Sequence, residues 1–225
     1  MGPDDVSSAS EDEFCRYNRT EGDPGDSTHA DNGYVEGAAI PLAALTAAVG
    51  LYANDRLNLP QPTAPATSPI PLVIYGGSSA VGSYAIQLAT RSNIHPIIAV
   101  AGRARSHVEA LLDASRGDAI VDYRQGDEAV IRGIKTALKG EKCHYAFDAT
   151  ASQNSFQNLS KVLDIGSSKI TLVLPPEDNP TKEGRYAEIP EGITQSMTMV
   201  GSVHEDCQDL GYVFCRYFSK GLEEG

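Results

Sequence analysis

The chain has 225 residues, of which 41% are hydrophobic and 21% charged, and its formal net charge is −12. This length suits one large domain or two small ones, and it supplies enough apolar residues for a substantial core. The acidic balance argues against nucleic acid as a partner. No stretch resembles a signal peptide, and the apolar run 38–52, which Pro41 interrupts, is too short to cross a membrane. We therefore expect a cytoplasmic protein with no membrane partner.

Most of the negative charge lies at the start of the chain. Residues 1–33 hold nine acidic residues against two basic ones, so they contribute −7 of the net charge of −12. The same segment is rich in Ser, Gly and Asp and has no apolar periodicity, which is typical of disorder. We predict a disordered acidic tail over 1–36, followed by one folded domain over 37–225.

The first predicted element is a helix in the Ala- and Leu-rich stretch after the tail. Pro41 suits its first turn, and the apolar residues continue to about Tyr52. A proline-rich connector over 61–71 follows, and its backbone must be extended.

From residue 72 onward, short β-branched runs alternate with helical patterns. Strands are predicted at 72–75, 96–101, 119–121, 144–148, 169–174 and 198–203. Helices are predicted at 81–91, 106–114, 128–138, 152–163 and 205–219. Continuous apolar strands that alternate with helices indicate a parallel sheet covered on both faces. Right-handed crossovers then give a doubly wound, Rossmann-type α/β fold of about six strands in the order 3-2-1-4-5-6.

A glycine-rich turn joins the first of these strands to its helix, in the stretch "PLVIYGGSSAVGSYAIQLA". It reads Gly77-x-Ser79-x-x-Gly82, with Ser79 where a dinucleotide-binding motif has its middle glycine. We expect Gly77 to make the tight turn and Gly82 to let helix and strand pack closely. The helix start favours an anion, and serine hydroxyls there can donate to phosphate. The predicted phosphate loop is Gly77, Ser78, Ser79, Ala80, Val81 and Gly82, with an ordinary strand-to-helix turn as the alternative.

The end of the second strand indicates which nucleotide fits. Ser83 and Tyr84 stand where a nucleoside triphosphatase needs Lys-[Ser/Thr], so that class is disfavoured. Where an NAD enzyme places an acidic residue the chain has Gly102, and a basic stretch follows it. Guanidinium groups pair with phosphate in a forked geometry, so the pattern favours NADP(H) over NAD(H). The residues concerned are Gly102, Arg103, Arg105 and Ser106, and the alternative is two solvated arginines at the start of a surface helix.

Several stretches together resemble one known family. They are the glycine turn, "AAIPLAALTAAVGLY" before it, "DAIVDYR" at 118–124 and "GYVFCRYFSKGL" at 211–222. Over 37–225 the chain is similar to the medium-chain dehydrogenase/reductase superfamily, and most of all to its zinc-independent quinone oxidoreductases and fungal enoyl reductases. The resemblance implies an NADPH-dependent reductase that acts on an activated double bond or carbonyl.

The resemblance also assigns residues to parts of the nucleotide site. Thr46 matches a threonine near the nicotinamide, and Ser78 to Gly82 match the pyrophosphate loop. Tyr123 matches a tyrosine that packs by the adenosine phosphate. The edge of the nicotinamide pocket is matched by Ala149, Thr150 and Leu174.

The chain departs from the family's pattern at both ends. Family members begin with a catalytic domain, for which residues 1–36 are too few and too polar, and they continue beyond the last residue of this chain. We therefore expect the nucleotide-binding domain, truncated at its C-terminus. Four cysteines lie scattered without a CxxC pair and the five histidines lack metal-binding spacing, so we expect no metal site.

Two functions follow from these patterns. The first is a zinc-independent, NADPH-dependent oxidoreductase that transfers hydride to a small quinone or enoyl-type substrate. The second is a module that binds NADPH without turnover. No residue stands out as the proton donor, so the catalytic residues are unknown, and homodimerisation is left open.

Overall fold

The computed structural model describes residues 30–151, 154–173, 186 and 189–224. The chain divides into two compact units, 1–41 and 42–225, and each is considered by itself. Of the predicted tail, residues 1–29 lie outside the described residues, whereas 30–36 have helical backbone at the start of α2 (Ala30–Tyr52). Pro41 therefore lies inside this helix, and the prediction that it occupies the first turn is wrong. The boundary between the two units follows Pro41 directly, where the helix lacks a backbone N–H donor.

The second unit contains a six-stranded, fully parallel sheet in the order β3-β2-β1-β4-β5-β6. This order is the predicted one, so the doubly wound Rossmann-type fold is confirmed. The strands are β1 (Leu72–Tyr75), β2 (Ile97–Ala101), β3 (Ala119–Asp122), β4 (Tyr145–Asp148), β5 (Ser168–Leu172) and β6 (Ile193–Met197).

The position of the sixth strand is a correction. We predicted it at 198–203, but β6 lies at Ile193–Met197 and a 3-10 helix, η3 (Val200–His204), follows it. As the edge strand, β6 has one partner, and only Ile193 in it is buried. Its sequence, ITQSM, is largely polar, so it lacks the continuous apolar run that predicts the other strands. Thr198 directly follows the strand, and its hydroxyl lies 2.6 Å from that of Thr171.

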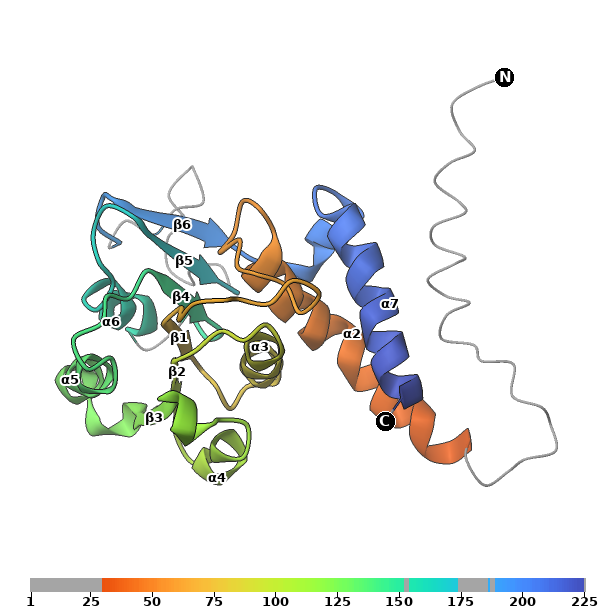
Figure 1. Ribbon diagram of the computed structural model, residues 1–225, viewed down its shortest axis with the longest axis horizontal. Helices are drawn as coiled ribbons and strands as arrows, with labels where there is room; N and C mark the ends of the chain where they lie inside the picture. The colour runs from red at the N-terminus through yellow and green to blue at the C-terminus, as the bar shows by residue number, and fades with distance from the viewer. Residues whose placement is uncertain (1–29, 152–153, 174–185, 187–188, 225) are drawn as a thin grey trace, which may run out of the picture. The chain divides into compact units, whose positions relative to one another are not determined.

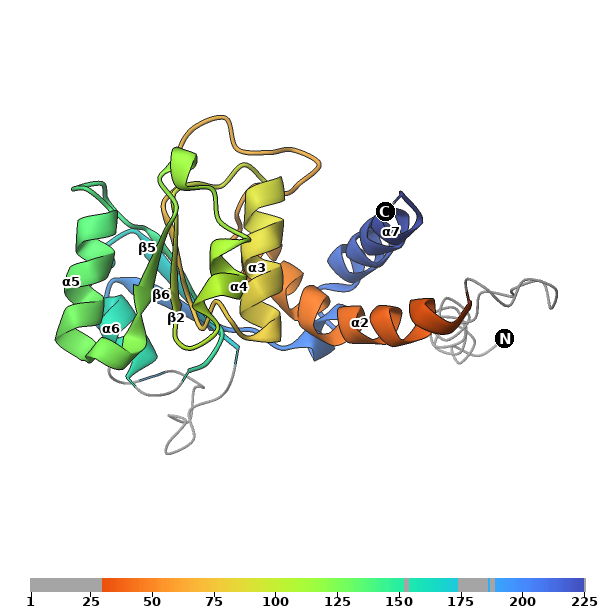
Figure 2. The ribbon, with the colours of Figure 1, turned by 90° about the horizontal axis from the view of Figure 1, so that it is seen from below.

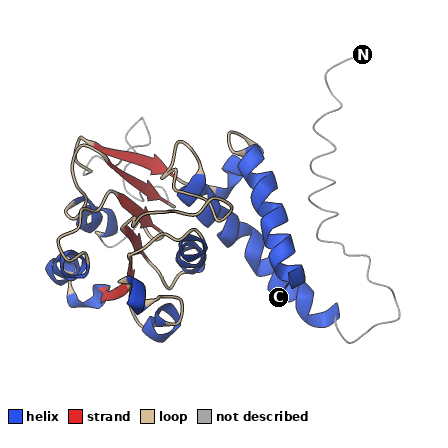
Figure 3. Ribbon diagram, in the orientation of Figure 1, coloured by secondary structure: helices blue, strands red, loops and turns tan. Residues whose placement is uncertain are grey.

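Helices cover both faces of the sheet (Figures 1 and 2). Two helices pack on one face, α5 (Asp127–Ala137) and α6 (Ser155–Ser160). The other face carries α2 from Leu42 onward, α3 (Ala80–Arg91), α4 (Arg105–Glu109) and α7 (Gln208–Glu224). Figure 3 shows the strands in red between these helices. Because side chains alternate along a strand, Leu72 and Ile74 point to the face that carries α2, α3, α4 and α7, whereas Val73 and Tyr75 point to the face that carries α5 and α6.

Helix α7 packs against the rest of the second unit through Phe214. Phe214 is buried and stacks on Tyr52, with ring centroids 5.0 Å apart. The Tyr52 hydroxyl lies 2.8 Å from Ser92 Oγ and donates to the Leu88 carbonyl at 3.0 Å, which ties α2 to α3. Helix packing is therefore the role of Phe214, as the spacing of apolar residues in 205–219 predicts. None of the described helices is both long and apolar enough to cross a membrane.

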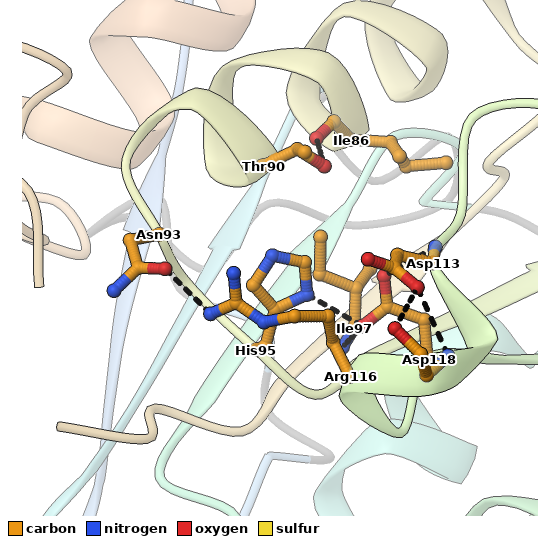
Figure 4. Close-up of polar contacts among 9 residues, drawn as sticks. Ile86, Thr90, Asn93, His95, Ile97, Asp113, Arg116 and Asp118 are labelled. Atoms are coloured by element: carbon orange, nitrogen blue, oxygen red, sulfur yellow. Dashed lines mark hydrogen bonds and ion pairs between the residues drawn. The ribbon is translucent and has the colours of Figure 1, made fainter.

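At the amino edge of the sheet, one buried carboxylate joins β2 to β3 (Figure 4). Asp118 Oδ1 accepts from the Ile97 amide at 2.7 Å and lies 2.8 Å from His95 Nδ1. Its Oδ2 accepts from the Asp113 amide at 3.0 Å. With Asp118 only 8% exposed, these bonds fix the entry of both strands.

A hollow of about 460 Å³ lies at the same amino edge, with Arg116 and Lys139 among its lining residues. Arg116 donates to Asn93 Oδ1, as Figure 4 shows. The C-terminal end of α5 lines the hollow, and helix C-termini carry partial negative charge, which accounts for cations there. The helix end at this edge therefore disfavours an anion, whereas the helix start at the opposite edge favours one.

Candidate functional site at the carboxyl edge of the sheet

The candidate site lies where the chain reverses its winding. β1 and β4 are neighbours, with Tyr75 opposite Asp148, yet β1 leads to α3 on one face and β4 to α6 on the other. The loops that leave these strands diverge, and the crevice between them is where open α/β sheets bind ligands. The Ala149 amide still donates to the Tyr75 carbonyl at 3.0 Å, so both loops start from the same point.

The tight turn after β1 contains both glycines, since the Ser79 amide donates to the Gly76 carbonyl at 2.9 Å across Gly77, but Gly76 is the one whose backbone conformation requires glycine. Gly76 has a φ of +78°, which side chains rarely adopt, and its amide and that of Gly77 both donate to the Val100 carbonyl at 3.0 Å. Gly77 also serves packing. A Cβ atom there would lie 3.2 Å from both Ala99 Cβ and Ile86 Cδ1.

Gly82 has the role that the spacing indicates. A Cβ atom at this position would lie 2.2 Å from the Gly76 carbonyl oxygen and 2.9 Å from its carbon. These are backbone atoms, so no side-chain rotation can make room. The absence of a side chain is thus what lets the start of α3 approach the end of β1.

Ser79 caps the N-terminus of α3. Its φ of −72° and ψ of 160° are extended, so a serine fits where the usual motif has glycine. Its Oγ accepts from the Gly82 amide at 3.0 Å, which leaves the hydroxyl proton free to be donated. The amides of Ala80 and Val81 have no intrahelical acceptor, because they are the first residues of the helix. With no acidic residue in the first turn, this end of α3 presents only donors and the positive end of the dipole.

The loop after β4 is organised by the fully buried carboxylate of Asp148. Its Oδ1 accepts from the Thr150 amide and hydroxyl, both at 3.0 Å, and from the Ala151 amide at 2.9 Å. Its Oδ2 accepts from the Ser155 hydroxyl at 2.5 Å. Burial raises the pKa of Asp148, and these hydrogen bonds oppose the rise. The loop so fixed contacts the glycine turn, since a Cβ on Gly76 would lie 2.5 Å from Thr150 Cγ2.

The end of β2 is covered by a tyrosine and surrounded by arginines. Gly102 is buried under the ring of Tyr123. Arg103 and Ser106 are exposed, and Arg103 forms no ion pair within the described part of the chain. Arg105 is exposed too, but its Nε lies 2.6 Å from Glu109 Oε1.

Two predicted site residues stand apart from this group. Thr46 is buried, and its hydroxyl donates to the Leu42 carbonyl one turn earlier in α2, at 2.6 Å. It lies one turn before Gly50, where a Cβ would meet Phe147 and Thr198 near the carboxyl edge. Leu174 lies outside the described residues. The roles of both residues stay predictions.

Three contributors were not found from the sequence. Two glycines stand in a row in the sequence, and only the backbone angle shows that Gly76 is the one with a positive φ. The pattern Asp148-x-Thr150 is typical of a carboxylate that accepts a hydrogen bond from the backbone amide two residues later, so it could have predicted the ordered loop after β4. Arg124 pairs with Asp122 through two nitrogens and holds the pKa of that carboxyl at about 2.

Three possible metal ligands also meet away from this edge. Asp55, Asp206 and Cys207 place ligand atoms within 4.8 Å of one another. The guanidinium of Arg56 contacts both carboxylates, and one of these contacts is 3.9 Å long. An ion-pair cluster accounts for this group.

The fold and the glycine turn at its switch point define the class of Rossmann-type α/β domains. No protein-family profile matches the chain. The chain is 50% identical to the trans-enoyl reductase fsr4 of Gibberella fujikuroi over 194 residues, which are 85% of this chain and 55% of that protein. It is 32% identical to the trans-enoyl reductase fsa3 of a Fusarium species over 143 residues, or 63% of this chain and 38% of that one. The chain thus spans about half the length of its relatives, or less.

Solved structures share the fold. JamJ enoyl reductase has a TM-score of 0.63 at 18% identity, over 87% of this chain and 53% of its own. The quinone oxidoreductase of Pseudomonas syringae has a TM-score of 0.62 at 16% identity, over 85% and 55%. These structures show the Rossmann-type fold, and the sequence similarity to trans-enoyl reductases supports the resemblance to the medium-chain dehydrogenase/reductase superfamily.

The close approach at Gly82 generates a first prediction. Gly82→Ala should lower the free energy of unfolding by about 3 kcal/mol or more, because the added methyl group meets backbone atoms that cannot rotate away. Gly221→Ala in α7 is the matched control, since a Cβ there meets nothing within 4 Å, and it should stabilise by roughly 0.5–1 kcal/mol. Urea denaturation measures both, and equal effects would contradict the packing described at Gly82.

The buried carboxylate generates a second prediction. Because the pKa of Asp148 is raised in the folded state, its contribution to stability is greatest below its ordinary value of 3.8 and is lost as the pH rises through the raised value. We subtract the free energy of unfolding of Asp148→Asn from that of the wild type. This difference should decrease as the pH rises from below 3.8 through the raised pKa. Thermal or urea denaturation at a series of pH values measures the difference. A difference that is flat or rises with pH would show that the pKa is not raised.

Proposed function

We propose that the carboxyl edge binds NADP(H) and that the protein is a zinc-independent oxidoreductase that reduces activated double bonds of the enoyl type. One observation carries the binding proposal. The start of α3, with free amides and a serine cap, is brought against the end of β1 at the switch point, because Gly82 has no side chain.

The residues of the glycine turn suit a diphosphate. The amides of Ala80 and Val81 and the hydroxyls of Ser78 and Ser79 supply donors, and the helix dipole favours negative charge. A bulky residue in place of Gly82 would close this cradle. On the neighbouring loop, Asp148 holds Ala149 and Thr150 in one conformation beside the turn, which suits them to line the nicotinamide end.

The preference for NADP(H) over NAD(H) rests on the end of β2. Gly102 offers no acid to bind ribose hydroxyls or to repel a 2′-phosphate. Arg103 is exposed and has no carboxylate partner among the described ion pairs, so its guanidinium is available to a phosphate. Arg105 is paired with Glu109, so we assign it the smaller share.

The substrate class comes from the relatives. Two of them are named trans-enoyl reductases, and 50% identity over most of this chain supports a related substrate. When bound, NADPH supplies the hydride for such a reduction. The chain's own residues orient the nicotinamide and exclude water from it. We assign no proton donor.

The second candidate function is a module that binds NADPH without turnover. It needs only the nucleotide site, for which the start of α3 supplies donors, and no proton donor is assigned among the described residues. Location and assembly are proposals as well. We propose a reducing, cytoplasmic environment, since Cys143, Cys207 and Cys215 are free thiols, and a homodimer is left open.

Loss of absorbance near 340 nm tests these alternatives. Full-length protein is mixed with NADPH and a panel of enoyl thioesters and quinones, with and without a zinc chelator. The reductase proposal predicts oxidation that needs an enoyl substrate and survives the chelator. Binding of NADPH without oxidation would support the second candidate, and no binding of either nucleotide would overturn both.

The arginines generate a prediction about selectivity. Arg103→Ala should weaken NADPH binding by about 1–3 kcal/mol, because a charge-assisted contact is lost, and should leave NADH binding nearly unchanged. Arg105→Ala should cost less, since Glu109 already engages that guanidinium. Arg132→Ala, at an exposed position of α5, is the matched control. Equal losses for both nucleotides in a fluorescence titration would show that the 2′-phosphate site is misplaced.

A further inference from the structure

Gly76 is the point where three segments of the carboxyl edge meet. Its amide donates to the Val100 carbonyl at 3.0 Å, which ties it to the end of β2. Its carbonyl oxygen lies against the start of α3, where a Cβ on Gly82 would be 2.2 Å away. On the β4 side, a Cβ on Gly76 itself would lie 2.5 Å from Thr150 Cγ2 and 3.5 Å from Ala149 Cβ. The glycine turn and the loop after β4 are therefore in contact through Thr150.

The side chain of Thr150 has one fixed orientation. A single torsion places both of its branches, and its hydroxyl donates to Asp148 Oδ1 at 3.0 Å. Because that bond fixes one branch, it also places the methyl group Cγ2 against Gly76. The backbone is held as well, since the Thr150 and Ala151 amides donate to the same carboxylate oxygen at 3.0 and 2.9 Å. With Asp148 fully buried, Thr150 cannot turn away from Gly76 without breaking these bonds.

The next residue has a backbone conformation that alanine rarely adopts. Ala151 has a φ of +48°, in the left-handed region, which costs a residue with a side chain about 1–2 kcal/mol. It is buried and belongs to the apolar core that contains Tyr75 and Phe156, and its amide bond to Asp148 offsets the cost. A strained loop that its surroundings hold in one conformation is typical of functional sites.

We infer that Thr150 is a positioning residue that sets the separation between the glycine turn and the loop after β4. Its hydroxyl proton is engaged by Asp148 and its methyl group contacts Gly76, so it acts on a nucleotide through these neighbours. A dinucleotide is covalently continuous from the turn to that loop, so a change in their separation lowers its affinity. A nucleotide that reaches only the turn is insensitive to the separation. The inference rests on the proposed binding of NADP(H) at this edge.

A purely structural role for Thr150 makes a different prediction. Substitution would then lower the stability of the domain and would change the affinities for a dinucleotide and for half of one by the same factor. A positioning role changes these two affinities differently. Adenosine 2′,5′-bisphosphate is a suitable half, because it carries the phosphates proposed to bind at the start of α3 and the end of β2 and lacks the nicotinamide.

The experiment compares Thr150→Val, which keeps the methyl group and loses the hydroxyl, with Thr150→Ser, which does the reverse. Thr136→Val and Thr136→Ser are the matched controls, since Thr136 is exposed on α5 and its hydroxyl donates to the Arg132 carbonyl of the same helix. Dissociation constants for NADPH and for the bisphosphate are measured by titration calorimetry. Melting temperatures without nucleotide show that each variant is folded in the assay.

We expect both Thr150 variants to weaken NADPH binding by roughly tenfold, because the loop after β4 loses its hydrogen bond to Asp148 or its contact with Gly76. Their affinity for the bisphosphate should change by less than about twofold, because Gly76 keeps its bond to Val100. The Thr136 variants should change neither affinity.

A double-mutant cycle tests the contact itself without nucleotide. Gly76→Ala places a methyl group against Thr150 Cγ2, so it should lower the melting temperature less in the Thr150→Ser background than in the wild type. The strain that alanine suffers at the positive φ of Gly76 is common to both backgrounds and cancels. Equal losses in the two backgrounds would overturn the contact and the inference with it.

Two outcomes of the binding measurements would also overturn the inference. One is an NADPH affinity that neither Thr150 variant changes, and the other is a loss of affinity for NADPH and the bisphosphate by the same factor. Failure of the proposed function gives a different result, because the wild type itself then binds neither compound. In that case the positioning role fails with it, whereas the cycle still measures the contact.

Discussion

The approach of α3 to β1 is the constraint on which the candidate site depends. With no side chain on Gly82, the helix starts against the Gly76 carbonyl, and its free amides open directly into the switch point of the sheet. The Ser79 side chain accepts from the Gly82 amide, leaves the amides of Ala80 and Val81 free, and keeps its own proton available. The positive end of the helix dipole completes the arrangement, which provides the electrostatics that a diphosphate needs.

Each neighbouring loop is fitted to this turn by a separate interaction. On the β4 side, the buried carboxylate of Asp148 folds its loop so that Thr150 fills the space beside Gly76. On the β2 side, Tyr123 covers Gly102 and leaves the arginine-rich surface beyond it open. The amino edge contrasts with this arrangement. There the carboxylate of Asp118 accepts structural hydrogen bonds from the Ile97 and Asp113 amides, and the C-terminal end of α5 disfavours an anion.

Much of the fold could be predicted from the sequence, because buried parallel strands occur in it as continuous apolar runs between helical patterns. The prediction was wrong where that rule does not hold. β6 is an edge strand with polar residues, and α2 continues past Pro41. In the site, the spacing of Ser79 and Gly82 was sufficient, since both act through local backbone geometry. The choice of Gly76 over Gly77, the pairing of Arg105 with Glu109 and the covering of Gly102 by Tyr123 depend on backbone angles or on residues brought together by folding. No spacing rule contains that information.

The central claim is that the carboxyl edge, at the start of α3 and the end of β2, binds a 2′-phosphorylated adenine nucleotide. Amide NMR of the chain during titration with adenosine 2′,5′-bisphosphate tests it most directly, with AMP as the comparison. The account predicts saturable shifts at the amides of residues 77–82 for both compounds, and at 102–106 and Tyr123 for the bisphosphate above all. Shifts confined to the hollow at the amino edge, beside Arg116 and Lys139, or no saturable shifts at all, would contradict it.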